Sequence, residues 1–202
     1  MITEELVREL FHTEKALQSF IPEDSQEVME QLVSISEIHC YQKGERLYEI
    51  GDVQSKVYLL VDGILRGYVL DDMQTDITDC FMTDRWMAAN SADFFIEGSR
   101  KPSFVGMEAL TESNVLEIAA DPLFEMLQKY SQLAKMYAWW LGKALDFQNE
   151  INHKRLYLSG SKRYEWFCEK WPEVDRIASN RQIATFLGIR SEYLSRLRHP
   201  KK

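Results

Sequence analysis

The chain has 202 residues and a formal net charge of −8, and with 45% hydrophobic and 28% charged residues it has the balance of an ordinary soluble globular protein. No stretch reaches the roughly 18 apolar residues of a membrane span, and Met1–Leu6 lacks the basic start of a secretory signal, so we expect a cytoplasmic protein without membrane contact. Three widely spaced cysteines (Cys40, Cys80 and Cys168) form no disulfide framework, zinc pattern or iron–sulfur ligand set, so we expect no cofactor and structural thiols, with a redox sensor as the weaker alternative.

The first segment, residues 1–37, is predicted to be helical. Apolar side chains recur at helical spacing from Ile2 to Phe20, and Pro22 interrupts the pattern. A second helical stretch runs from about Ser25 to Val33. We expect both to cover the end of the region that follows.

Short strands separated by turn residues are predicted from Ile38 to Ile118. Lys43-Gly44-Glu45 and Gly51-Asp52 are turns, and the strands Val57–Val61 and Ile64–Leu70 flank Asp62-Gly63, which predicts a β-hairpin. Further strands are expected at 76–82, 103–109 and 115–119. Many short strands at this spacing indicate a small barrel or jelly roll, which we assign to residues 1–120.

A long helix is predicted over residues 121–158, with Asp121 as its cap and Pro122 in its first turn. One apolar row falls at seven-residue intervals: Tyr130, Tyr137, Ala144, Ile151 and Leu158. With its parallel rows it forms a broad apolar face. Packing on the barrel is one explanation and a symmetric helix–helix dimer is the other, which we favour because the helix is so long. Leu158–Ser161 is the best domain boundary.

The tail beyond the long helix differs from the body in charge. Residues 151–202 carry twelve basic and five acidic side chains, a net charge of +7, which leaves −15 for residues 1–150. An acidic body with a basic tail is expected when one part of a protein approaches phosphates. A solvated basic surface is the simpler alternative.

Within this tail, residues 177–199 have the arrangement of a helix-turn-helix. Ser179 and Gln182 fit a capping box, and a short helix follows to Leu187. Gly188 permits a sharp reversal before a second helix over Ser191–His199. The pattern therefore predicts a DNA-binding domain over residues 159–202.

The second helix presents Glu192 and Arg196, four residues apart, on one outward face. Arginine can donate two hydrogen bonds to guanine, and glutamate can accept one from cytosine. Arg190 and Ser191, at the start of the helix, could reach bases or phosphates. Further positive charge for phosphate contacts comes from a group of basic side chains: Arg181, Arg198, His199, Lys201 and Lys202. The alternative is an ordinary helical hairpin in which Glu192 and Arg196 pair only with each other.

The whole chain resembles the Crp/Fnr family of bacterial transcription regulators. The resemblance is carried by Tyr41–Leu47, Gly51-Asp52, Val57–Arg66 and Gln182–Arg196. It implies an α+β fold: an N-terminal cyclic-nucleotide-binding-like β-roll (a double-stranded β-helix or jelly roll), a long dimerisation helix and a C-terminal winged helix-turn-helix. The positions that match the family's recognition helix include Ser191, Glu192 and Arg196.

The sequence lacks the residue pairs with which members of the family bind cyclic AMP. Members that bind cyclic AMP carry a Gly-Glu pair for the ribose and an Arg-Ser or Arg-Thr pair for the phosphate. In the matching stretch, Phe81–Asn90 and Phe94–Phe104, no Gly-Glu occurs, and Lys101-Pro102-Ser103 stands at the place of the second pair, where proline removes a backbone donor. We therefore expect an effector other than cyclic AMP, or none. A mainly aromatic and basic group of residues predicts a pocket for such an effector, or simply a filled core. The group comprises Arg85, Trp86, Phe94, Phe95, Arg100 and Ser103, with Phe104 beside them.

Two further departures concern the iron sensors of the family and the wing. No N-terminal cysteine group for an iron–sulfur cluster is present, and the adjacent His39 and Cys40 offer only a weak case for a haem ligand. Only Pro200-Lys201-Lys202 follows the recognition helix, and residues 161–178 read as helical, so no wing is predicted on either side.

The function predicted from sequence is a sequence-specific DNA-binding regulator that acts as a homodimer. Two recognition helices would enter successive major grooves of a palindromic site, about 34–36 Å apart. RNA polymerase and an unidentified small molecule are further expected partners. No nucleophile elbow, phosphate loop or zinc helix is present, so we expect no enzyme. The alternative is a regulatory module whose cyclic nucleotide or other small effector binds the β-roll.

Overall fold

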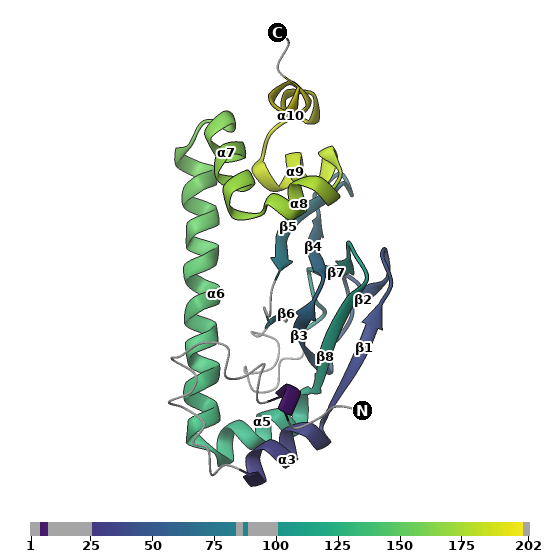
Figure 1. Ribbon diagram of the computed structural model, residues 1–202, viewed down its shortest axis with the longest axis vertical. Helices are drawn as coiled ribbons and strands as arrows, with labels where there is room; N and C mark the ends of the chain where they lie inside the picture. The colour runs from purple at the N-terminus through teal and green to yellow at the C-terminus, as the bar shows by residue number, and fades with distance from the viewer. Residues whose placement is uncertain (1–4, 8–25, 84–86, 89–100, 200–202) are drawn as a thin grey trace.

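The computed structural model describes residues 5–7, 26–83, 87–88 and 101–199. A β-roll forms the body, a long helix stands along one side of it, and a group of short helices lies across one end (Figure 1). No helix in the described ranges is both long and apolar enough to cross a lipid bilayer.

Two four-stranded antiparallel sheets make up the roll. The first has the order β1-β8-β3-β6 and the second the order β2-β7-β4-β5. Their bounds are β1 Ser36–Tyr41, β2 Arg46–Tyr48, β3 Lys56–Asp62, β4 Ile64–Leu70, β5 Asp76–Thr83, β6 Met87–Ala88, β7 Gly106–Ala109 and β8 Ser113–Ala119. The α+β fold and the roll expected from the sequence are confirmed.

The β-hairpin predicted at Asp62-Gly63 is wrong. β3 pairs with β8 and β6, whereas β4 pairs with β5 and β7, so the chain crosses from one sheet to the other at this point. Gly63 alone separates the two strands, and one residue is too short for the two-residue turn of a hairpin. Gly63 has φ +103°, and a Cβ there would lie 2.3 Å from the Ser113 hydroxyl oxygen. The corner therefore needs a glycine both for its positive φ and for the close approach to Ser113, although it is not a hairpin turn.

The other turns fall where the sequence places them. Gly44 and Gly51 both have positive φ, as tight turns often require. The hairpin of the second sheet joins β4 to β5 through residues 71–75, where the Asp71 carboxylate accepts hydrogen bonds from the amides of Met73 and Thr75.

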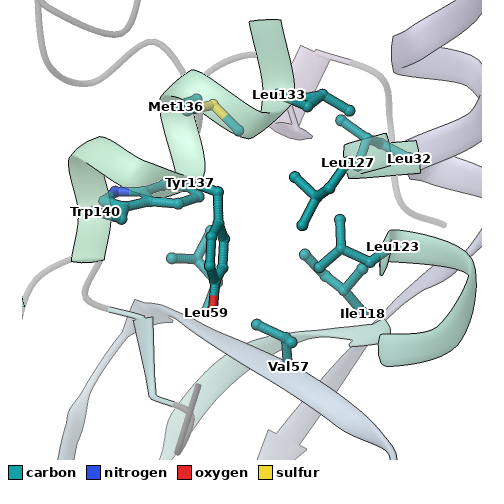
Figure 2. Close-up of a pocket in the computed structure, with 10 residues that line it drawn as sticks. All are labelled: Leu32, Val57, Leu59, Ile118, Leu123, Leu127, Leu133, Met136, Tyr137 and Trp140. Carbon is teal, nitrogen blue, oxygen red and sulfur yellow. The ribbon is translucent and has the colours of Figure 1, made fainter. Parts of the chain in front are cut away.

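Three clusters of buried side chains hold the molecule together, and the first lies inside the roll. Tyr48, Leu60, Leu65 and Val115 belong to it. The second lies where three helices cover the outer face of the first sheet: α3 Gln26–Ser34, α5 Ala120–Lys129 and α6 Ser131–Tyr157. Figure 2 shows apolar side chains of this cluster around a cavity of about 20 Å³. Such a space holds one water at most, so this part of the molecule is core and not a ligand site.

The long helix predicted over residues 121–158 is divided at Tyr130. This residue has φ −113° and ψ 102°, an extended conformation that ends α5 and starts α6. Its hydroxyl donates to the carboxylate of Glu27 (2.8 Å) and contacts the amide oxygen of Gln31, both on α3, so a tertiary contact accompanies the break. Asp121 lies in the first turn of α5 and is not its cap, which is Ala119.

The broad apolar face predicted for the long helix has two parts. Tyr137 and Ile151 are buried against their own chain, as the first explanation, packing on the barrel, requires. Ala144 and Leu141 are exposed, and Leu141 keeps 38% of its accessible surface. Packing on the body therefore explains only part of the face.

Four short helices form the C-terminal group, which we call the head. They are α7 Gly160–Lys170, α8 Pro172–Ile177, α9 Asn180–Leu187 and α10 Ser191–Arg198. The third buried cluster joins Phe167, Trp171, Phe186 and Leu194 of the head to Phe81 of β5. The head thus shares a core with the roll and is not joined to it by a linker alone.

Candidate nucleic-acid interface

The turn between α9 and α10 is built from short-range signals. The Ser179 hydroxyl accepts from the Gln182 amide (3.2 Å), and the Gln182 side-chain oxygen accepts from the Ser179 amide (2.8 Å), a complete capping box. At the other end Gly188 has φ +63°, and the Ile189 amide donates to Ala184 (3.0 Å). This left-handed cap reverses the chain into α10.

The two helices are held in place by small residues and one buried leucine. Ala184 is buried in α9, and Leu194 is the buried side chain of α10. On α7, a Cβ at Gly160 would lie 2.8 Å from the Tyr193 ring, so this glycine lets α10 approach closely. One face of α10 is thereby fixed to the head, and the opposite face is left free of the core.

That opposite face carries the predicted base-reading residues. Glu192 and Arg196 are exposed, Arg190 is exposed at the N-cap, and Ser191 is half-buried. The Arg196 guanidinium lies 5.8 Å from the centroid of the Tyr193 ring. Within the described part of the chain no ion pair joins Glu192 to Arg196, so mutual pairing does not account for the two charges.

Arg198 belongs to the interior of the head. Its guanidinium donates to the side chain and the backbone carbonyl of Asp175, both at 2.6 Å, and to the side-chain oxygen of Asn180. Although partial burial disfavours its charge, the hydrogen bonds to Asp175 and Tyr164 raise the pKa of Arg198 above its ordinary value. The side chain is only 17% exposed and joins three helices of the head, so most of its donors are already used.

The remaining basic residues divide into two groups. Arg181, in the first turn of α9, and His199, at the end of α10, are exposed. Lys201 and Lys202 lie outside the described residues. In the described tail, residues 159–199, no strand occurs, so no wing precedes the helix-turn-helix.

Most of the predicted effector pocket lies outside the described residues, namely Arg85, Trp86, Phe94, Phe95 and Arg100. Ser103 is described and buried, and its hydroxyl donates to the Val105 carbonyl (2.8 Å), so it completes a local turn. Phe104 is 68% exposed and therefore does not line the interior.

A larger cavity lies elsewhere, where the roll, α6 and the head meet. Its volume is about 420 Å³. The side chains that line it include aromatic and charged residues of all three parts: Phe81, Lys143, Phe147, Glu150, Lys170 and Trp171. The Glu150 carboxylate accepts from the Trp166 indole (3.0 Å) and pairs with Lys170, which ties α6 to α7. Among the described residues, no group of three or more His, Cys, Asp or Glu side chains is arranged to hold a metal ion.

Sequence reasoning missed the residues that join head and roll, above all Arg155 near the end of α6. Its guanidinium donates to the Phe186 carbonyl (2.7 Å) and to carbonyls of β5. No local signal could have found it, because its partners lie more than thirty residues away.

The fold is shared with known transcription regulators. FixK2 from Bradyrhizobium japonicum is 20% identical over 81% of this chain and 82% of its own, with a TM-score of 0.65. A regulator assigned to the Crp/Fnr family from Eubacterium rectale is 16% identical over 89% and 85%, with a TM-score of 0.70. CLP, a c-di-GMP-responsive global regulator of Xanthomonas campestris, is 15% identical over 85% and 88%, with a TM-score of 0.66. A scan against protein-family models and a search of curated proteins gave no match. At this level of identity the likeness establishes a fold common to Crp/Fnr regulators.

Proposed function

We propose that this chain is a DNA-binding transcription regulator of the Crp/Fnr family. The observation that carries the proposal is the exposed face of α10, where Glu192 and Arg196 project from a helix whose other face is fixed by Leu194. An arginine and a glutamate one turn apart on an exposed helix can read base edges in a major groove. The fold of known regulators supports this function over an enzymatic one.

Phosphate contacts would come from the exposed residues around that face. Arg181 and Arg190 start the two helices of the motif, where backbone amides also favour an anion. Lys201 and Lys202 would add charge beyond α10. We propose that Arg198 positions α10 through Asp175 and does not itself contact phosphate.

Homodimerisation through α6 is part of the proposal. Six exposed residues follow one another at intervals of four and three along this helix: Ala138, Gly142, Leu145, Asn149, Asn152 and Leu156. Leu145 is 62% exposed and Leu156 75% exposed. This spacing is that of a two-helix coiled-coil seam, and the leucines would lose their exposure in a dimer. RNA polymerase is a further expected partner of such a dimer.

Light scattering tests the dimer. We expect a dimer at micromolar concentration and a monomer after Leu145→Glu, which places a charge in the seam. Leu70→Glu is the matched control, because Leu70 is also exposed (43%) but lies at the end of β4. A monomeric wild-type protein would contradict this part of the proposal.

For the effector, we propose a molecule other than cyclic AMP, or none. The cavity of about 420 Å³ has the size of a small-molecule site and touches the parts whose relative placement would have to change. Calorimetry should detect no micromolar binding of cyclic AMP, and tight binding would overturn this expectation.

In vitro selection from a random duplex library tests the main proposal. We expect a palindromic sequence to be enriched, with two half-sites one helical turn apart, about 10–10.5 base pairs. Affinity for the selected duplex should fall steeply as salt rises, because bound phosphates release their counterions. If no sequence is enriched and no duplex is bound at low salt, the chain is not a DNA-binding regulator.

A further inference from the structure

The first helix of the motif, α9, rests directly on strand β5 of the roll. Three kinds of contact meet there. They are a half-buried arginine that donates to backbone carbonyls of both elements, a network of polar side chains, and aromatic rings.

The arginine contact uses an irregularity in the sheet. Gly67 pairs with Cys80 and Tyr68 with Thr78, so Asp79 is an extra residue without a partner on β4, a β-bulge. Arg155 Nη2 donates to the carbonyls of Thr78 (3.4 Å) and Asp79 (3.3 Å) on this bulge. The guanidinium thus satisfies backbone acceptors that the ladder does not fully use.

The same guanidinium also holds α9. Arg155 Nε donates to the Phe186 carbonyl at 2.7 Å, and the guanidinium carbon lies 4.9 Å from the centroid of the Phe186 ring. Among the described residues no carboxylate lies within ion-pair distance of Arg155. The guanidinium therefore contacts carbonyls and an aromatic ring. Its planar set of N–H donors reaches both α9 and β5, and we call this contact the clamp.

Polar side chains extend the contact toward the start of α9. The Thr185 hydroxyl accepts from the Thr78 amide (3.1 Å) and donates to the Thr78 hydroxyl (3.2 Å). Arg66, buried in β4, donates to the Thr78 hydroxyl (2.8 Å) and to Glu108 (2.8 Å). The Gln182 side chain donates to the same Glu108 carboxylate at 3.4 Å. This network restricts the rotation of α9 relative to the sheet.

Aromatic packing closes the other end. Phe81 of β5 lies 5.2 Å from the Phe186 ring centroid and 5.7 Å from that of Phe167, both edge-on. All three side chains are buried. Such pairs favour particular orientations as well as burial, so the head is fixed in rotation as well as in position.

We infer that Arg155 is a positioning residue that locks the head to the roll and thereby sets which spacing of half-sites the dimer accepts. This inference rests on the proposed function. A dimer whose two heads are each clamped to a rigid body presents its recognition helices at one separation and one relative rotation. A dimer with loosened heads adapts to several.

The test varies the centre of the selected palindrome. Inserting or deleting one base pair rotates one half-site by about 34–36° relative to the other, from the 10–10.5 base pairs of a helical turn. We expect the wild-type dimer to lose about tenfold or more in affinity, measured by fluorescence anisotropy, as large as the loss from a mismatched base pair. Arg155→Met should lose no more than about threefold on the same duplexes, while its affinity for one isolated half-site stays within about twofold of wild type.

Arg163→Met is the matched control. Arg163 also donates to backbone carbonyls of α9, that of Leu187 at 2.6 Å, but it lies on α7 inside the head. Its loss should lower stability and leave the spacing preference intact. A similar broadening in both variants would show that general loosening, and not the clamp, explains the effect.

A cross-link tests the same inference in the opposite direction. The hydroxyl oxygens of Thr78 and Thr185 are 3.2 Å apart, within reach of a disulfide once both are cysteine. In Arg155→Met protein that also carries Thr78→Cys and Thr185→Cys, oxidation should restore the wild-type spacing penalty, and reduction should remove it again.

The outcomes separate the two proposals. If wild type selects no sequence, the proposed function fails. If wild type selects a palindrome and Arg155→Met keeps the full spacing penalty, only the positioning role fails. Should Arg155→Met not fold, Arg155→Lys replaces it, because an ammonium on a flexible stem lacks the fork that holds both elements. A wild-type spacing penalty in Arg155→Lys would then overturn the inference.

Discussion

The two helices of the motif, α9 and α10, have the same length of eight residues but opposite environments. α9 buries Ile183, Ala184, Phe186 and Leu187, whereas α10 buries only Leu194. One helix is held by the core and by strand β5, and the other carries exposed charges. Under the proposed function, stability and recognition would be assigned to neighbouring helices. Substitutions should therefore change one property without the other.

The largest effect is expected for Phe186→Ala in α9. The Phe186 ring is fully buried and packs against Phe81, Phe167 and Trp171 at 5.2–5.7 Å between ring centroids. Removing it should lower the free energy of unfolding by about 3–5 kcal/mol, as for other large core truncations. Urea unfolding followed by tryptophan fluorescence measures the change. Phe104→Ala, at a phenylalanine that is 68% exposed, should cost less than about 0.5 kcal/mol. Equal losses would contradict the role given to α9.

Arg196→Ala in α10 should lower DNA affinity and leave stability unchanged. We expect DNA affinity to fall by about 1–3 kcal/mol and base preference to relax at one position of each half-site, as for loss of a bidentate arginine. Unfolding in urea should be unchanged, because the side chain is exposed. Arg176→Ala removes another exposed charge, on α8, and should change neither DNA affinity nor stability. Unchanged affinity and base preference in Arg196→Ala would remove the base-reading role.

The head could be predicted closely because its signals are local. The capping box of Ser179 and Gln182 and the left-handed Gly188 each act within a few residues, so the pattern alone located both helices. The β-roll as a class was equally accessible, since its turns and short strands recur along the chain. Strand pairing could not be predicted from the sequence in this way. Asp62-Gly63 has the chemistry of a hairpin turn, but β3 pairs with β8 between residues that are 52 to 63 positions apart in the chain.

The site was predictable only in part for the same reason. Glu192 and Arg196 follow from helical spacing, and both are exposed. Arg198 has the same residue type and a similar position, yet Asp175 occupies its guanidinium. Arg155 looked like one more basic residue of the tail, although its partners lie on β5 and α9. Which charge faces solvent and which is used internally is decided by tertiary packing.

A smaller effect is expected at the start of α9. Ser179→Ala removes the acceptor for the Gln182 amide and should lower the free energy of unfolding by about 1 kcal/mol. Because the cap serves the scaffold helix, the affinity of folded protein for the selected duplex should stay within about twofold. Thermal or urea unfolding and anisotropy on the same preparation measure both. Ser195→Ala, at a half-buried serine within α10, is the matched control and should not reproduce the loss of stability. A loss of affinity larger than the loss of stability would assign Ser179 to the DNA contact.

The smallest effect, and the one that limits the division between the helices, concerns Arg181. It lies on the scaffold helix but is exposed in its first turn, where an anion is favoured. Arg181→Ala should weaken binding to all sequences alike and reduce the slope of log affinity against log salt by about one unit per subunit, without changing base preference. Lys129→Ala, on α5 at the opposite end of the molecule, removes the same charge and should leave the slope unchanged (Figure 1). If the slope is unaffected by Arg181→Ala, α9 contributes only support, and the phosphate contacts belong to α10 and the residues after it.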